Sequence, residues 1–216
     1  DQDTTSKKGS YQKIIDDFAL HKYDILLGTQ MISKGLDFPL VSLVGVINAD
    51  TSLNMPDFRA NEKTFSLLYQ TSGRAGRSNI KGEVILQTYN PDNKVLNYVK
   101  NNDYEGFFKY ELGIRKALFY PPYSYIVLIK IVGKDYKETS DNANKIKKIL
   151  KDNLEGTIIY GPTPASVFKI NNIYHFQIII KYTKENNLYE VLKNIDNSYI
   201  LNNKVNVEIT FNPIRL

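Results

Sequence analysis

The stretch GTQMISKGLDF, residues 28–38, directly follows the apolar run ILL. This order predicts a short buried strand at Asp24–Gly28 that ends in a polar loop. Ligands of open α/β sheets bind beyond the carboxyl ends of the strands. Thr29 can donate its hydroxyl to a nucleic-acid phosphate, Gly35 permits close backbone approach to a nucleotide, and Asp37 can accept from a ribose hydroxyl. The alternative is a strand-to-helix loop whose glycine and aspartate only satisfy turn geometry.

A second motif, QTSGRAGR at Gln70–Arg77, begins about forty residues later. Arg74 and Arg77 lie three residues apart and therefore face the same way on a helical turn. Planar guanidinium groups suit the charge that develops on a transferring γ-phosphate, where an arginine finger contributes roughly 10³–10⁵ in rate. The alternative is a pair of solvated arginines at a helix end. The preceding Gln70 and the spacing from the first motif favour the functional interpretation.

Around these motifs, strand and helix signals alternate, which predicts a parallel α/β sheet. The near-continuous apolar run LVSLVGVI at 40–47 predicts a central strand covered on both faces. The other expected elements are a helix at 11–20, a helix at 61–73, a strand at 83–89, a helix from about Pro91 to Val99 and a connecting helix at 103–118.

The pattern changes after the stiff FYPPY segment, Phe119–Tyr123, which is the expected domain boundary. The predicted elements beyond it are strands at 123–132, 157–160, 165–170, 174–182 and 204–211, a turn at Asn171–Asn172, and helices at 137–153 and 187–196. The helix at 137–153 has Ala143, Ile146 and Ile149–Leu150 at helical spacing. Residues 157–160 and 165–170 read as strand, and the order is βαββαβ, a ferredoxin-like α+β arrangement. We therefore expect domains at 1–118 and 119–216.

Composition is that of an ordinary globular protein, with 42% hydrophobic and 24% charged residues. The net charge of +5 is uneven, because residues 1–105 carry −1 and residues 106–216 carry +6. A basic C-terminal half suits a phosphate-bearing partner or simply aids solubility. The absence of cysteine excludes disulfides and thiolate zinc sites, and two distant histidines make a metal site unexpected. We expect no membrane span, and the initial Asp1 suggests part of a longer protein.

Two motifs of a complete ATPase are missing. The chain has no Gly-x-x-x-x-Gly-Lys-[Ser/Thr] phosphate loop, and no Asp-Glu box follows a hydrophobic strand to hold Mg²⁺. We therefore expect these residues not to hydrolyse ATP on their own.

The two motifs resemble motifs V and VI of superfamily 2 helicases. Further segments make the resemblance specific to the PriA family (primosomal protein N′), the bacterial replication-restart helicases. These segments are Asp1–Thr5, Gly28–Pro39, Asn48–Thr51, Pro56–Ala60 and Gln87–Pro91, and Tyr120–Tyr123 resembles the start of the family's C-terminal domain. The likeness covers nearly the whole chain and is densest over residues 24–125. It implies the second, RecA-like lobe of an ATP-dependent 3′→5′ DNA helicase, without its opening strand, followed by the ferredoxin-like domain.

The resemblance also implies roles for single residues. Thr29, Gln30 and Lys34 are expected to contact the translocating DNA strand. The expected nucleotide-facing residues are Gly35, Asp37, Gln70, Arg74 and Arg77, with Arg77 as the finger.

Cofactors and partners follow from the resemblance as well. The expected cofactors are ATP and Mg²⁺, in a site that a first lobe completes, and zinc in the full-length protein, bound by cysteines outside these residues. The expected partners are single-stranded and forked DNA, single-strand DNA-binding protein and other primosome proteins, in the bacterial cytoplasm.

Several interpretations remain open. Asp57–Arg59 is either a surface near the ATP cleft or a structured loop with a buried Phe58. Six aromatic residues of the C-terminal half either stack unpaired bases or form the core beneath the helices, and we favour the core for most. They are Tyr123, Tyr125, Phe168, Tyr174, Phe176 and Tyr182. For the whole chain, the alternatives are a non-enzymatic module that binds single-stranded nucleic acid or protein, and another superfamily 2 translocase.

Overall fold

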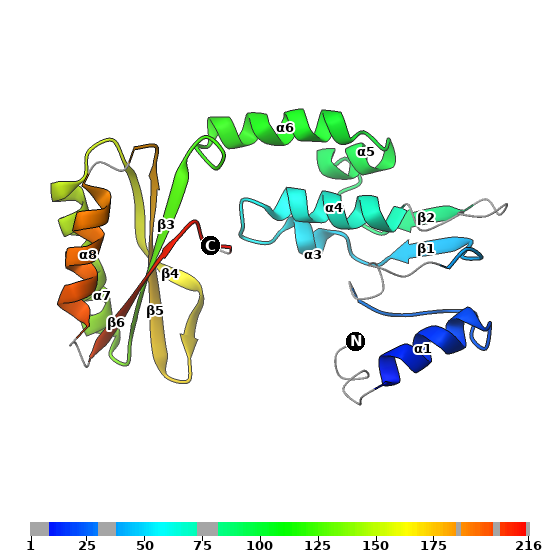
Figure 1. The fold of residues 1–216 in the computed structure, drawn as a ribbon, viewed down its shortest axis with the longest axis horizontal. Coiled ribbons are helices and arrows are strands. Elements are labelled where there is room, and N and C mark those ends of the chain that lie inside the picture. Colours follow the sequence, from blue (N-terminus) through cyan, green and yellow to red (C-terminus); the bar gives the residue numbers. More distant parts are fainter. Residues whose placement is uncertain (1–8, 30–37, 73–81, 185–186, 201–203, 215–216) are drawn as a thin grey trace. The chain divides into compact units, whose positions relative to one another are not determined.

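The protein is represented by a computed structural model that describes residues 9–29, 38–72, 82–184, 187–200 and 204–214. The chain divides into two units, one of Asp1–Met55 with Arg59–Lys109 and one of Pro56–Phe58 with Tyr110–Leu216. Each unit combines helices and strands around its own hydrophobic core (Figure 1).

The first unit is built on a parallel pair of strands, β1 (Leu43–Val46) and β2 (Glu83–Leu86). Its helices are α1 (Ser10–Ala19), α3 (Asp50–Leu53), α4 (Ala60–Ser72), α5 (Lys94–Lys100) and the first part of α6 (Tyr104–Ala117). Parallel pairing with intervening helices confirms the α/β arrangement predicted for this half of the chain.

Helix α4 forms the centre of the first unit's core. Its buried side chains recur every three or four residues and therefore share one face: Ala60, Thr64, Phe65, Leu68 and Thr71. The ring of Phe65 stacks on that of Phe107 in α6, with centroids 4.0 Å apart and an interplanar angle of 2°. This packing fixes the rotation of α4 about its own axis.

The predicted strand at Asp24–Gly28 is wrong, because this segment has no strand conformation. Ile25 and Leu27 are 83% and 81% exposed. An apolar run becomes a strand only where a neighbour satisfies its backbone groups, and within the described ranges β1 and β2 pair only with each other. The strand expected at 40–47 is present as β1, but it is not covered on both faces, since Leu43 is 55% exposed.

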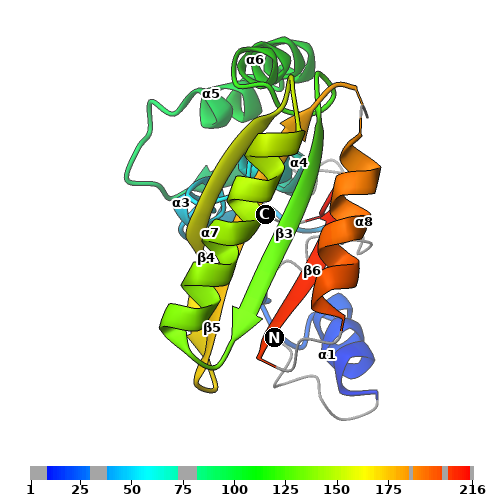
Figure 2. The ribbon, with the colours of Figure 1, turned by 90° about the vertical axis from the view of Figure 1, so that its left-hand side faces the viewer.

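The second unit contains one antiparallel sheet in the order β4-β5-β3-β6. Its elements are β3 (Tyr125–Gly133), α7 (Tyr136–Asn153), β4 (Ile158–Ile170), β5 (Ile173–Tyr182), α8 (Leu188–Tyr199) and β6 (Val205–Phe211). Helices α7 and α8 lie side by side on one face of the sheet (Figures 1 and 2). The predicted order of strands and helices is therefore confirmed.

One difference concerns β4, because the sequence predicted strand conformation at 157–160 and 165–170 but not between them. The chain instead continues through Gly161 and Pro162 as one strand, with register shifts against β5 between Tyr160 and Thr163 and again between Pro164 and Lys169. Gly161 has a φ of +93°, and a Cβ there would lie 2.6 Å from the Gln177 carbonyl oxygen. Glycine therefore permits the irregularity that keeps β4 paired.

The core of the second unit lies between the sheet and its two helices. Alternate residues of β3, Val127, Ile129 and Ile131, are fully buried there. Helix α7 contributes Ala143, Ile146 and Leu150 to the core, as the helical spacing predicted, whereas Ile149 is 40% exposed. Aromatic side chains also belong to this core: Phe176 and Tyr182 are buried, and Phe168 and Tyr174 pack against it. This placement confirms the structural interpretation for four of the six aromatic residues.

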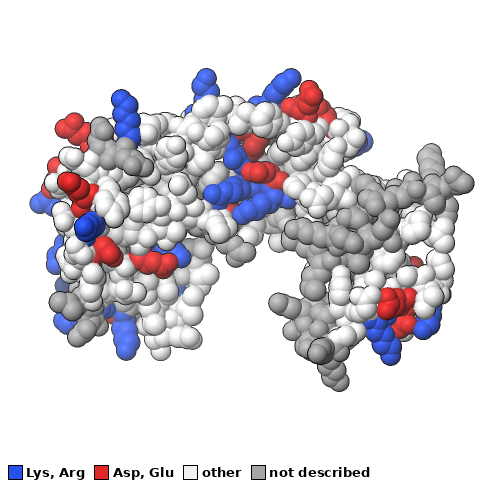
Figure 3. Space-filling model, viewed as in Figure 1, with Lys and Arg blue, Asp and Glu red and all other residues white. Residues whose placement is uncertain are grey.

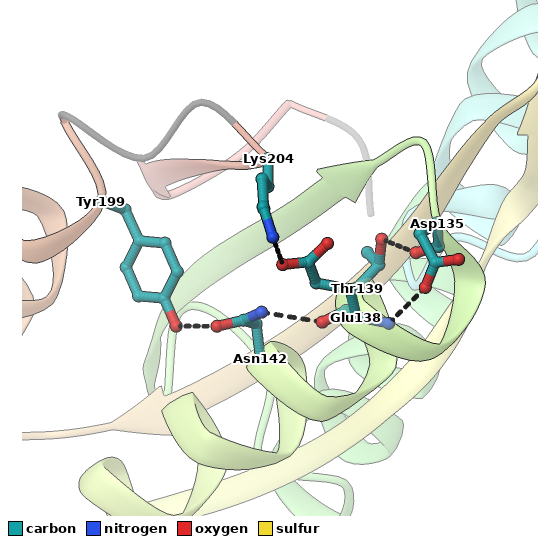
Figure 4. A network of polar contacts seen from close by, with 6 residues as sticks. All are labelled: Asp135, Glu138, Thr139, Asn142, Tyr199 and Lys204. Atoms are coloured by element: carbon teal, nitrogen blue, oxygen red, sulfur yellow. Dashed lines mark hydrogen bonds and ion pairs between the residues drawn. The ribbon is translucent and has the colours of Figure 1, made fainter.

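A polar network fastens the two helices and the start of β6 to each other (Figure 4). The Asp135 carboxylate caps α7 by accepting from the Glu138 N–H at 2.7 Å. Lys204 forms a 3.2 Å ion pair with Glu138, and the Tyr199 hydroxyl donates to the Asn142 side chain at 2.9 Å. These bonds hold α8 against α7 at the rim of the core.

Candidate functional site

Of the eight predicted site residues, Thr29 and Gln70 are among the described residues, and both are exposed. The other six lie outside the described residues: Gln30, Lys34, Gly35, Asp37, Arg74 and Arg77. Their placement is not tested, and their roles remain predictions.

Gln70 lies in the last turn of α4, on the face opposite the core. Its amide Nε2 donates to the Ser66 hydroxyl one turn earlier, at 3.1 Å. In the same turn, the Thr71 hydroxyl donates to the Leu67 carbonyl at 2.7 Å. Because one face of α4 is packed in the core, the helix presents Gln70 outward and leads the chain directly into the segment with the two arginines.

The carboxyl ends of β1 and β2 are joined by hydrogen bonds. The Ala49 N–H donates to the Gln87 carbonyl at 3.0 Å, so the two segments of the chain stay paired beyond the ends of β1 and β2. The Asp50 carboxylate accepts from the Thr88 hydroxyl at 2.7 Å and from the Tyr89 N–H at 3.0 Å. These contacts hold a polar surface at the edge where open α/β sheets bind ligands.

Asp50 is held as a carboxylate by this arrangement. The hydrogen bond from Thr88, followed by that from Tyr89, lowers the pKa of Asp50 below its ordinary value of 3.8. The Asn48 side chain accepts from the Thr51 N–H at 3.2 Å and orders the turn into α3. The motifs that contain these residues carry the family resemblance, but sequence reasoning assigned Asp50 and Thr88 no role.

Phe58 packs within the second unit. Its ring stacks on that of Tyr120, with centroids 4.7 Å apart and an interplanar angle of 8°. The guanidinium carbon of Arg115 lies 5.2 Å from the Phe58 centroid. Arg115 is itself fixed by a 3.1 Å ion pair with Glu111 and by donation to the Pro121 carbonyl at 3.3 Å. Of the two alternatives for Asp57–Arg59, this half-buried ring supports the structured loop.

Tyr120 also contacts the sheet through Lys181 of β5. The Lys181 ammonium lies 3.3 Å from the Tyr120 centroid and donates to the Leu118 carbonyl at 2.8 Å. Lys181 is only 3% exposed, and burial lowers its pKa. Burial also raises the pKa of Tyr120. The chain between α6 and β3 is therefore attached to the centre of the sheet.

The surface charges of both units are mixed. On the face drawn in Figure 3, lysines and arginines are interspersed with acidic residues. Within the described ranges, no group of three or more His, Asp or Glu side chains is arranged to hold a metal ion. Among the same residues, no helix has the length and apolar character needed to cross a membrane.

Two family models match different parts of the chain. Residues 3–79 match the helicase conserved C-terminal domain, and residues 116–214 match the primosomal protein N C-terminal domain. The first match includes both opening motifs, Gly28–Phe38 and Gln70–Arg77.

Curated relatives resemble nearly the whole chain. A protein of Bacillus subtilis named replication restart protein PriA is 45% identical over 99% of this chain and 27% of its own length. Proteins of the same name from Synechocystis and Chlamydia muridarum are 42% and 37% identical over 84% and 99% of this chain. The chain spans 22% and 29% of the length of those two relatives, so it corresponds to about a quarter of such a protein.

Proposed function

Since the chain belongs to the PriA family, whose C-terminal region it matches, we propose that it forms the second helicase lobe and the C-terminal domain of an ATP-dependent 3′→5′ DNA helicase. In this proposal, the whole protein restarts stalled replication forks and assembles the primosome. The observation that carries it is the presence of both family matches, at 3–79 and 116–214, on one chain. The proposed domains are 1–118, a RecA-like lobe, and 119–216.

The lobe supplies one wall of an ATP site. ATP, bound with Mg²⁺, supplies the γ-phosphoryl group that is transferred to water. Arg77 acts as the arginine finger and Arg74 supports it, because guanidinium groups neutralise charge on that group without a proton transfer. Gly35, Asp37 and Gln70 face the nucleotide, and the exposed position of Gln70 on α4 leaves its side chain accessible to a ligand.

The same lobe contacts the translocating strand through Thr29, Gln30 and Lys34. A hydroxyl, an amide and an ammonium group all donate to phosphate oxygens, and such contacts position DNA without reading its sequence. The exposure of Thr29 is consistent with this role.

The second domain is proposed to have a ferredoxin-like fold. The antiparallel order β4-β5-β3-β6 with both helices on one face supports this assignment. The proposed partners are single-stranded and forked DNA, single-strand DNA-binding protein and other primosome proteins, in the bacterial cytoplasm. Zinc is proposed to bind outside these residues, since the chain contains no cysteine.

ATP hydrolysis by a protein with both helicase lobes, compared with this chain alone, tests the proposal. We expect hydrolysis stimulated by single-stranded DNA in the two-lobed protein and none in the chain alone. If the two-lobed protein binds single-stranded DNA but never hydrolyses ATP, the helicase proposal is wrong and the non-enzymatic binding module is supported.

A further inference from the structure

We propose that Tyr89 is a stacking platform for an unpaired base of the DNA strand that the helicase lobe contacts. This inference rests on the proposed helicase function and deepens it, because it adds a contact to a base to the proposed contacts with phosphates. Tyr89 lies in the first unit, shortly after the end of β2 at Leu86. The proposed function gives this residue no role.

The first support is the exposure of the Tyr89 side chain. Tyr89 is 92% exposed, the highest value among the exposed large hydrophobic residues of the described ranges. The faces of its ring are therefore accessible to a planar ligand. Ile47, which directly follows β1, is also 72% exposed. Exposed apolar side chains thus follow both strands of the parallel pair.

The second support is the set of hydrogen bonds that fixes the backbone at Tyr89. The Tyr89 N–H donates to the Asp50 carboxylate at 3.0 Å, and the Asn90 N–H donates to the Thr88 hydroxyl at 3.0 Å. The Asn90 carbonyl accepts from the Asn93 N–H at 3.1 Å. Because the backbone is already ordered, a ligand that stacks on the ring has to immobilise only the side chain, which lowers the entropic cost of binding.

The third support is the place of Tyr89 in the first unit. Its segment follows the carboxyl end of β2, and Asp50, to which it is bonded, follows the carboxyl end of β1. Open α/β sheets bind ligands beyond the carboxyl ends of their strands. The chain then enters α5, whose Val95 and Leu96 are buried in the core of the same unit. The ring is therefore presented between two elements that the core holds in place.

The charges around Tyr89 favour a base over a phosphate as its ligand. The segment 87–93 contains one charged residue, the acidic Asp92, and the Asp50 carboxylate is bonded to Thr88 and Tyr89. Carboxylates repel phosphates, whereas every base has an aromatic face that can stack on tyrosine. Such stacking tolerates any sequence, as a protein that moves along DNA requires.

Binding of a single-stranded oligothymidylate to the two-lobed protein tests the stacking role. Tyr89→Leu keeps an apolar side chain but removes the ring, and we expect it to raise the Kd roughly 5- to 150-fold. Tyr89→Phe keeps the ring, so its Kd should stay within about twofold of that of the unsubstituted protein. Tyr189→Leu, at a 64% exposed tyrosine of α8, is the matched control and should leave the Kd unchanged.

Two further measurements distinguish a contact with a base from a contact with a phosphate. The slope of log Kd against log salt concentration should be the same in Tyr89→Leu and in the unsubstituted protein, since stacking releases no counterions. An abasic oligonucleotide of the same length keeps the phosphates but has no base to stack. We expect Tyr89→Leu and the unsubstituted protein to bind this abasic strand with equal Kd.

Three results would contradict this role of Tyr89. An unchanged Kd in Tyr89→Leu, in a protein whose unsubstituted form binds the oligothymidylate and hydrolyses ATP, overturns the stacking role and leaves the helicase proposal intact. A loss of affinity that is equally large on the abasic strand, or that Tyr89→Phe shares, also overturns it, because the face of the ring is then not the cause. An unsubstituted two-lobed protein that neither binds the single strand nor hydrolyses ATP contradicts the function and the inference together.

Discussion

The Asp50 carboxylate accepts a 2.7 Å hydrogen bond from the hydroxyl of Thr88, which lies 38 positions later in the chain. This bond joins the segments that follow β1 and β2. It therefore stabilises the edge of the parallel sheet at which a nucleotide or nucleic acid is proposed to bind.

Thr88→Val should destabilise the first unit in a pH-dependent manner. The pKa of Asp50 is lowered in the folded chain. The stability that the Asp50 carboxylate contributes through its hydrogen bonds is therefore fully present above the ordinary pKa of 3.8, and it is lost as pH falls through the folded pKa. We expect Thr88→Val to have a lower thermal midpoint than the unsubstituted chain at pH 6, and a smaller deficit near pH 2. An equal deficit at both pH values would contradict this role of the carboxylate.

Ile146→Ala should lower the free energy of unfolding of the second unit by about 2–5 kcal/mol, because the side chain is fully buried in the core. Ile149→Ala, on the same helix but 40% exposed, is the matched control and should cost about 0.5 kcal/mol. Urea denaturation measures both. Similar losses in the two variants would show that α7 is rotated relative to the structure.

Gly161→Ala should destabilise the chain by about 1–3 kcal/mol, because φ is +93° and the added Cβ would meet the Gln177 carbonyl oxygen. Gly113→Ala provides the opposite control. Gly113 lies in α6, and a Cβ added there would meet nothing within 4 Å. We therefore expect Gly113→Ala to raise the free energy of unfolding by about 0.5–1 kcal/mol through helix propensity. If Gly161→Ala is as stable as the unsubstituted chain in urea denaturation, the positive φ of Gly161 and its close approach to the Gln177 carbonyl are contradicted.

Local sequence patterns predicted the elements that depend on local physics. The spacing of Ala143, Ile146 and Leu150 identified α7 and most of its buried face. The turn at Asn171–Asn172 was predicted because asparagine tolerates positive φ, and both residues have it, at 49° and 62°. The same turn predicts the antiparallel pairing of β4 with β5, because a short turn joins these two consecutive strands.

Long-range pairing could not be predicted in this way. The run at Asp24–Gly28 has the composition of a strand, but no described strand pairs with it. The continuity of β4 depends on its pairing with β5, which overrides the local signals of Gly161 and Pro162. The stack of Phe58 on Tyr120 joins residues 62 positions apart in the printed sequence, so no local pattern contains it.

The candidate site was identified by motifs rather than by geometry. The family matches confirm the resemblance that those motifs suggested. Six of the eight predicted residues lie outside the described part of the chain, and their roles therefore still rest on residue chemistry and resemblance. The polar edge formed by Asp50 and Thr88 was missed, because its two halves meet only in the folded unit.

Substitution of Arg77 in the two-lobed protein tests the central claim most directly. We expect Arg77→Ala to lower DNA-stimulated kcat for ATP hydrolysis by roughly 10³–10⁵, while Lys100→Ala, an exposed cation at the end of α5, leaves it unchanged. Arg77→Lys, which keeps the charge but loses the planar fork, should remain strongly impaired. Full kcat in Arg77→Ala would contradict the assignment of this lobe as the wall that supplies the arginine finger.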